Sequence, residues 1–95
     1  MSNIEDTLKE RGSNYGTFEG NAQLTQDLKS IYKEHIRAIG KQDLPAIHQE
    51  AIDMIFHKLS RIANGDPSFL DSWVDIVGYA QLVVNKLKED ALKLV

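Results

Sequence analysis

One stretch decides the fold: KLSRIANGDPSFLDSWVDIVGYA, residues 58–80. Asn64-Gly65 predicts the end of one helix and Asp66-Pro67 the beginning of another, because glycine ends helices and proline is tolerated in a first turn. The first helix ends in cations, and the second carries Asp71 and Asp75, four residues apart. Carboxylates at that spacing repel each other unless a cation or a metal ion lies nearby. This turn therefore indicates chemistry beyond packing.

The composition indicates one globular domain over residues 1–95. Apolar residues make up 42% and charged residues 26%, which is the balance of an ordinary folded domain. The net charge of −3 is too small for direct DNA binding through phosphate attraction. There are no cysteines, which excludes disulfides and thiolate metal sites. The beginning of the chain lacks an apolar signal segment, and no apolar run approaches the ~20 residues that cross a bilayer. We therefore expect a cytoplasmic protein without a membrane contact.

Hydrophobic periodicity predicts an all-α fold, a bundle of three long helices plus a short N-terminal helix. Turn and cap residues set the expected boundaries. In chain order we expect a short helix over 3–11 capped by Asn3, an ordered loop over 12–20, and long helices over 21–39, 43–63 and 66–95, the first long helix being stopped by Gly40.

The apolar positions predict the core. Tyr15 and Phe18 need cover, which indicates that the loop holding them is ordered. The stripe of the third helix that we expect to be buried consists of Ile47, Ala51, Ile55, Leu59 and Ile62.

The last helix predicts self-association. Trp73, Ile76, Val83 and Leu87, with their apolar neighbours, cover most of its circumference. A helix of that kind is either central in a bundle or shared with a second subunit. Gly78 weakens the helix, which is usually compensated by the close approach of another backbone. We therefore expect a homo-oligomer that associates through the last helix.

Two pairs of acids predict a magnesium site. Glu50 and Asp53 lie one turn apart on the third helix, and Asp71 and Asp75 lie on the last. Magnesium binds proteins through one or two carboxylates together with the phosphate oxygens of a substrate. These four acids are the predicted metal ligands.

Ion pairing is the alternative explanation for the same charges. If the two helices pack antiparallel, Arg61 meets Asp71, and either His57 or Lys58 meets Asp75. The charges would then neutralise each other between the helices, as ion-pair networks commonly do.

Cations and a glycine-containing loop predict the binding of phosphate. Lys58 and Arg61 would contact phosphate oxygens, while Arg11 and Tyr15 would close the site. Neither the P-loop nor the dinucleotide fingerprint is present. The loop is alternatively an ordered connector, and the basic stripe Lys29, Lys33 and Arg37 is either a second anion contact or a solvated helix face.

Several motifs resemble those of a family of small bacteriophage and prophage proteins. The resemblance covers residues 10–84 and is carried by Glu10-Arg11-Gly12, Tyr15-Gly16, Glu50-Ala51, Lys58-x-x-Arg61 and the run from Asp71-Ser72-Trp73 to Gly78-Tyr79-Ala80. It implies a phage accessory protein that acts in the cytoplasm of a host cell.

The paired acids on neighbouring helices are similar to those of the MazG-like all-α nucleoside triphosphate pyrophosphohydrolases. That family holds magnesium with Glu-x-x-Glu and Glu-x-x-Asp. The resemblance implies that Glu50 and Asp53 stand for the first pair and Asp75 for the last aspartate. Ser72 occupies the position where that family keeps glutamate, and Asp71 lies one residue earlier.

Together these patterns predict a protein that handles a nucleotide or a nucleotide-like phosphate. In the enzymatic form, magnesium-dependent hydrolysis of a (d)NTP would give a monophosphate and pyrophosphate. In the other form, the ligand is bound and sequestered without cleavage. A different class also fits the sequence: a non-enzymatic interaction module that inhibits a host defence or replication protein.

Overall fold

The computed structural model describes residues 2–93, and the regular structure of that range is helical throughout. In chain order the helices are α1 (Ser2–Tyr15), α2 (Phe18–Ala38), α3 (Ala46–Asn64) and α4 (Leu70–Lys93). The all-α class, with three long helices and a shorter N-terminal one, is therefore confirmed. Within the described range, no helix is long and apolar enough to cross a membrane. The predicted last two residues of the final helix, 94–95, lie outside that range.

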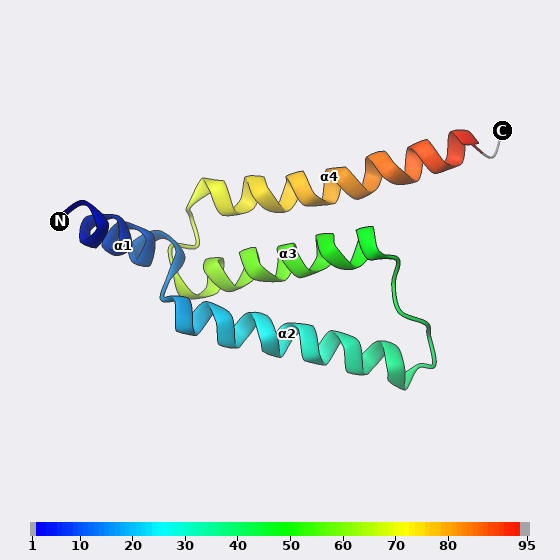
Figure 1. Cartoon of the computed structure of the whole chain (residues 1–95), viewed down its shortest axis with the longest axis horizontal. Coiled ribbons are helices and arrows are strands. Elements are labelled where there is room, and N and C mark those ends of the chain that lie inside the picture. Colours follow the sequence, from blue (N-terminus) through cyan, green and yellow to red (C-terminus); the bar gives the residue numbers. More distant parts are fainter. Residues whose placement is uncertain (1, 94–95) are drawn as a thin grey trace.

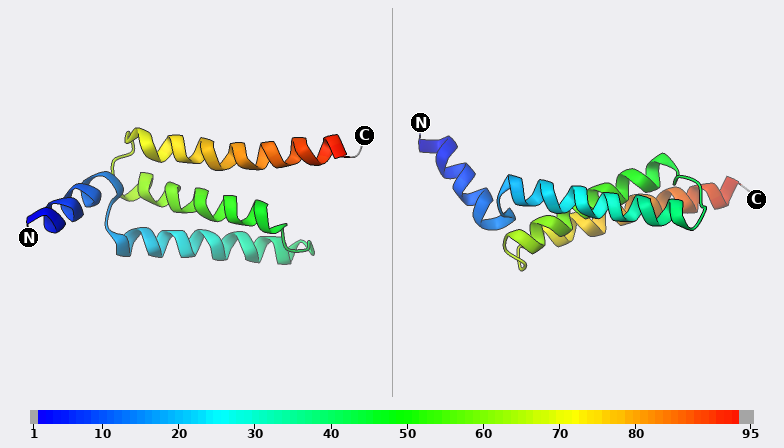
Figure 2. Two further views of the ribbon diagram at one scale, coloured as in Figure 1. Left: turned by 45° about the horizontal axis from the view of Figure 1, so that its top comes forward. Right: turned by 90° about the horizontal axis from the view of Figure 1, so that it is seen from below.

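The three long helices lie side by side in one layer with α3 in the middle (Figures 1 and 2). The contacts of α3 with α2 and with α4 dominate the packing, and α1 contacts only α3 substantially. Neighbouring helices run antiparallel because short connections join them. The layer leaves two broad faces of α3 without a covering helix from the same chain.

Small polar side chains join the helices of this layer. The hydroxyl groups of Thr25 and Ser60 share a hydrogen bond of 2.7 Å between α2 and α3, and the Asn64 amide donates to Asn21 Oδ1 at 3.1 Å. Ser60 and Ser72 are 0% and 1% exposed. Because these side chains are short, the helices approach closely, and the large apolar side chains are left to project from the two faces of the layer.

The predicted core is consequently right only in part for the single chain: Ala51 is buried, and Ile55 and Ile62 are half-buried. Among the described residues, Ala51 is the apolar residue that is fully buried. Ile47 is 46% exposed and Leu59 39%, and Phe18, for which we expected cover, is 84% exposed. The middle helix of a single layer buries only the two narrow strips that contact its neighbouring helices, and we call these strips the seams. Apolar residues that point off the layer therefore stay in contact with water.

The predicted loop over 12–20 is also wrong, since helix occupies most of it. Only Gly16 and Thr17 separate α1 from α2. The Thr17 hydroxyl accepts a hydrogen bond of 3.0 Å from the Gly20 amide and so caps α2. Gly16 takes the left-handed conformation, with φ of 82°. Asn3, the expected cap, lies within α1.

The end of α2 confirms the stop at Gly40. Gly40 has φ of 72°, its amide donates to the Arg37 carbonyl, and the Lys41 amide donates to the Ile36 carbonyl, at 3.0 and 3.1 Å. This pair of bonds is a Schellman motif. The start of α3 lies at Ala46, a little later than expected.

The turn between α3 and α4 is longer than predicted. Asp66 does not cap a helix; its carboxylate accepts from the Ser68 amide at 2.9 Å and holds a turn. The Trp73 indole donates to the Pro67 carbonyl at 2.8 Å, which fixes the beginning of α4 at Leu70.

Gly78 has no close neighbour within the chain. A Cβ atom placed on it would meet nothing within 4 Å. The backbone approach that its sequence context predicts is therefore not made by the described part of this chain.

Candidate functional site

The two seams of the layer fix the orientation of α3. Ser60 points toward α2, and Lys58 points toward α4. With 100° between successive helical residues, Glu50, His57 and Arg61 then lie together on one open side of α3. We call this side of the layer the polar face.

An ion pair beside this face joins α3 to α4. Lys58 Nζ lies 3.0 Å from Asp75 Oδ2. Lys58 is 8% exposed, whereas the Asp75 side chain is 46% exposed. This confirms one of the two predicted partners of Asp75. The exposed part of the carboxylate remains open to a second partner.

Arg61 makes a different contact from the one predicted. Its guanidinium carbon lies 4.5 Å from the centroid of the Tyr15 ring, a cation–π arrangement. The Phe69 ring supports Tyr15 edge-on at 5.2 Å. Among the ion pairs of the described residues none joins Arg61 to Asp71, so that predicted pair is wrong. The reason is the longer turn, which leaves Asp71 exposed in the first turn of α4.

A hollow of about 450 Å³ lies where α1, α2 and α3 meet. Arg11, Tyr15 and Arg61 line it, together with Phe18 and Asn21. Its size is in the range of small-molecule sites. Three of the four residues that we expected to contact a ligand therefore surround one cavity. Lys58, the fourth, lies in the neighbouring seam.

His57 reports the electrostatic character of the polar face. Burial lowers the pKa of His57 below its ordinary value of 6.5, and the positive charges of Arg61, Lys58 and Lys29 lower it further. Three cations therefore act on one imidazole. Clustered cations beside a cavity raise the local concentration of anions.

The four predicted metal ligands do not form a closed set. Among the described residues, no three His, Cys, Asp or Glu side chains gather closely enough to hold a metal ion. The register explains this. Lys58 pairs with Asp75, and Glu50 lies eight residues, about 12 Å, farther along the axis of α3. Asp53 accepts a hydrogen bond of 2.7 Å from the Gln49 amide. The metal site stays a prediction.

Ser72 lies in the seam between α3 and α4. It is 1% exposed, and its hydroxyl has no hydrogen-bond partner. The position that the MazG-like resemblance would assign to a glutamate is therefore a small residue buried between the two helices.

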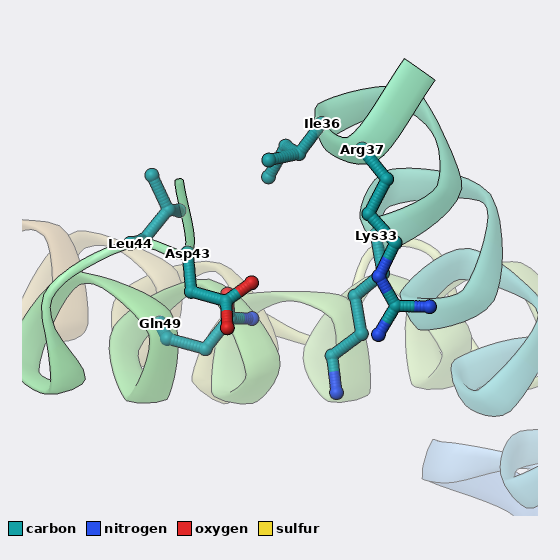
Figure 3. A pocket seen from close by; sticks show the side chains of 6 residues that line it. All are labelled: Lys33, Ile36, Arg37, Asp43, Leu44 and Gln49. Carbon is teal, nitrogen blue, oxygen red and sulfur yellow. The ribbon is translucent and has the colours of Figure 1, made fainter. Parts of the chain in front are cut away.

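The predicted basic stripe of α2 divides between two places. Lys29 acts on His57, whereas Lys33 and Arg37 line a second, smaller hollow of about 170 Å³ at the other end of the layer. Figure 3 shows Lys33 and Arg37 on one side of this hollow and Asp43 on the other. An acid thus balances part of the positive charge there.

Phe69, which supports Tyr15, has no sequence signal, because it lies in a turn far from Tyr15 in the chain. Lys29 belongs to the basic stripe that the sequence offers either as an anion contact or as a solvated face, and the fold brings it near His57.

Comparison with protein-family models, with curated proteins and with solved structures gave no match. The resemblances to a phage family and to the MazG-like enzymes remain predictions.

Proposed function

We propose that this protein binds a nucleotide or a nucleotide-like phosphate on the polar face. One observation carries the proposal: Arg61 lines a cavity together with Tyr15 and Arg11, and the charges of Arg61, Lys58 and Lys29 all act on His57. In the free protein burial lowers the pKa of His57, and these positive charges lower it further. A phosphate bound near these cations would offset their positive charge.

The roles follow from the geometry. Arg61 presents a planar donor fork suited to phosphate oxygens, and its stacking on Tyr15 fixes the plane of that fork. Arg11, on another wall of the cavity, would contact a second phosphate. The open part of the Tyr15 and Phe18 rings offers a surface on which a base would stack. Lys58 keeps its pair with Asp75 and would add positive potential.

We propose that magnesium binds together with the ligand and not to the free protein. Bound to phosphates it would neutralise their charge, and the exposed part of Asp75 is the carboxylate available to it on this face. Because Glu50 and Asp53 lie farther along α3, the described residues do not complete a metal site. We therefore propose binding or sequestration as the function. Hydrolysis of the bound ligand to a monophosphate and pyrophosphate is a more specific version of this proposal.

The proposal also covers the origin and the oligomeric state of the protein. The motif resemblance supports a phage accessory protein in the host cytoplasm, and the apolar circumference of α4 supports a homo-oligomer in which this helix takes part. In α4, Val77 is 66% and Leu82 60% exposed.

A second candidate function is a protein-interaction module. It is favoured by the number of large apolar side chains at the surface, such as Ile31, which is 67% exposed. In this function the protein would inhibit a host defence or replication factor, and the polar face would have no ligand.

Thermal melting with a panel of ribo- and deoxyribonucleoside mono-, di- and triphosphates, with and without magnesium, tests the proposal. Ligand at ten times its Kd stabilises by about 1.4 kcal/mol, which raises the melting temperature by roughly 6–11 °C for a domain of this size. Arg61→Gln should abolish the shift. Arg37→Gln, an arginine from the other hollow, is the matched control and should keep it. No shift with any nucleotide would refute the proposal.

A further inference from the structure

We infer that a second copy of this chain covers the side of the layer opposite the polar face. This side carries a continuous set of apolar side chains from all three long helices, which we call the apolar face: Leu24, Ile31, Ile52, Ile55, Leu59 and Ile76. The inference goes beyond the proposed function because it assigns the contact to this three-helix face, whereas the sequence predicts the last helix.

The seams determine which residues belong to the apolar face. On α3, Ser60 faces α2, Lys58 faces α4, and His57 lies on the polar face. The remaining direction, at helical steps of three and four, belongs to His48, Ile52, Ile55 and Leu59. The two open sides of α3 therefore differ in chemistry. Glu50, His57 and Arg61 lie on one side, and three branched apolar residues, with His48 at one end, lie on the other.

The helices α2 and α4, on either side of α3, extend both the polar face and the apolar face. Lys29 of α2 lies near His57, so the opposite side of α2 presents Leu24 and Ile31. On α4, Leu82 lies beside Glu50 in one groove of the polar side. The opposite side of α4 therefore presents Ile76.

The accessible surface of the chain is larger than that of a compact monomer of the same mass. It measures 7216 Å², whereas a compact monomer of 10.7 kDa exposes about 5,500 Å². The surplus is about 1,700 Å² per chain. A standard protein–protein contact buries ~800 Å² per partner, and obligate homodimers bury more. Part of this surplus belongs to α1 and to the end of α4, which project from the layer (Figure 1), and a standard contact on the apolar face would remove about half of it.

The shape leads to the same result. The radius of gyration is 16.5 Å, against ~12 Å for a compact chain of this length. Two identical layers placed face to face form a two-layer bundle of ordinary proportions. A two-fold contact needs one self-complementary patch, and a face whose α3 stripe carries no carboxylate, lysine or arginine satisfies this requirement. The polar face remains open, so ligand binding and pairing do not compete.

Light scattering coupled to size exclusion tests the inference. The wild type should show twice the chain mass of 10.7 kDa. Ile31→Glu should return the chain to 10.7 kDa or raise the dimer Kd at least 100-fold. Val74→Glu is the matched control, because Val74 is 54% exposed and lies two residues, or about 200°, beyond the buried Ser72, which places it on the outer side of α4. It should stay dimeric.

A second measurement covers the case in which Ile31→Glu fails to fold. The sequence has no cysteine, so Leu59→Cys and Val74→Cys each provide one thiol. Alkylation of the cysteine at position 59 should be at least tenfold slower than at position 74 and should accelerate on dilution below the dimer Kd. A monomeric wild type would overturn the inference, as would pairing that Val74→Glu breaks and Ile31→Glu leaves intact. The nucleotide melting shift is a separate readout, so the two proposals can fail independently.

Discussion

Lys58 and Asp75 form the ion pair that sets the register of α3 against α4. Their 3.0 Å contact joins a lysine that is 8% exposed to a carboxylate that is still half open to water. The buried partner cannot find another counter-charge by moving, so the pair defines how the two helices align. This alignment also determines which acidic side chains lie on the polar face.

Removing the charge of Asp75 should destabilise the fold. Asp75→Asn leaves the Lys58 ammonium buried without its partner, and we expect a loss of about 1–2 kcal/mol in the free energy of unfolding. This is less than the loss for a fully buried pair, because Asp75 is half exposed. Urea unfolding measures the change. Asp71→Asn, an exposed acid of the same helix, is the control and should cost under ~0.5 kcal/mol. Equal effects of the two substitutions would show that the pair does not fix the register.

Enlarging Ser60 should separate α2 from α3. Ser60 is 0% exposed and shares a 2.7 Å hydrogen bond with Thr25. Ser60→Leu places extra methylene groups in a closed seam, and we expect a loss of about 1–3 kcal/mol. Ser60→Ala removes only the hydrogen bond and should cost about 1 kcal/mol. Denaturant midpoints compare the two. A neutral Ser60→Leu would mean that the seam is open.

Two glycines should respond in opposite directions to alanine. A Cβ atom on Gly16 would lie 2.7 Å from the Asn64 backbone, and Gly16 has φ of 82°. We expect Gly16→Ala to destabilise by about 1–3 kcal/mol. Gly12 lies in α1 with nothing within 4 Å of an added Cβ, so Gly12→Ala should stabilise by about 0.5–1 kcal/mol. Melting curves of the two variants provide the comparison, and the same sign for both would contradict the contact between Gly16 and α3.

Acid should destabilise the free protein through His57. The pKa of this side chain is lowered in the folded state, so between that value and 6.5 the unfolded chain binds more protons than the folded one. Stability therefore falls as pH falls from 6.5 through the folded pKa. His57→Asn should remove this part of the pH dependence, as measured by urea unfolding at pH 7.5 and 5.5. An unchanged slope would show that folding does not lower the pKa of His57.

Local chemistry made part of the fold predictable. The stop at Gly40 follows from its left-handed conformation and the two hydrogen bonds that it permits. The pairing of Lys58 with Asp75 follows from two antiparallel helices joined by a turn. In both cases the responsible residues are close in sequence or are related by a short connection.

Burial could not be predicted in the same way. The periodicity of Leu59 is the same whether a helix of its own chain or a second chain covers it, so the sequence overestimated the internal core. The seam of Thr25 and Ser60 has no apolar signal. The stacking of Arg61 on Tyr15 depends on where α1 meets α3, which no local pattern encodes.

The pKa of His57, followed by NMR during a pH titration, tests the central claim most directly. The imidazole is titrated with and without a saturating nucleoside triphosphate, and again in the Arg61→Gln variant. An anion bound among Lys29, Lys58 and Arg61 should raise the pKa of His57 above its value in the free protein, and the variant should lose most of that rise. A pKa of His57 that is the same with and without nucleotide would contradict the proposed site.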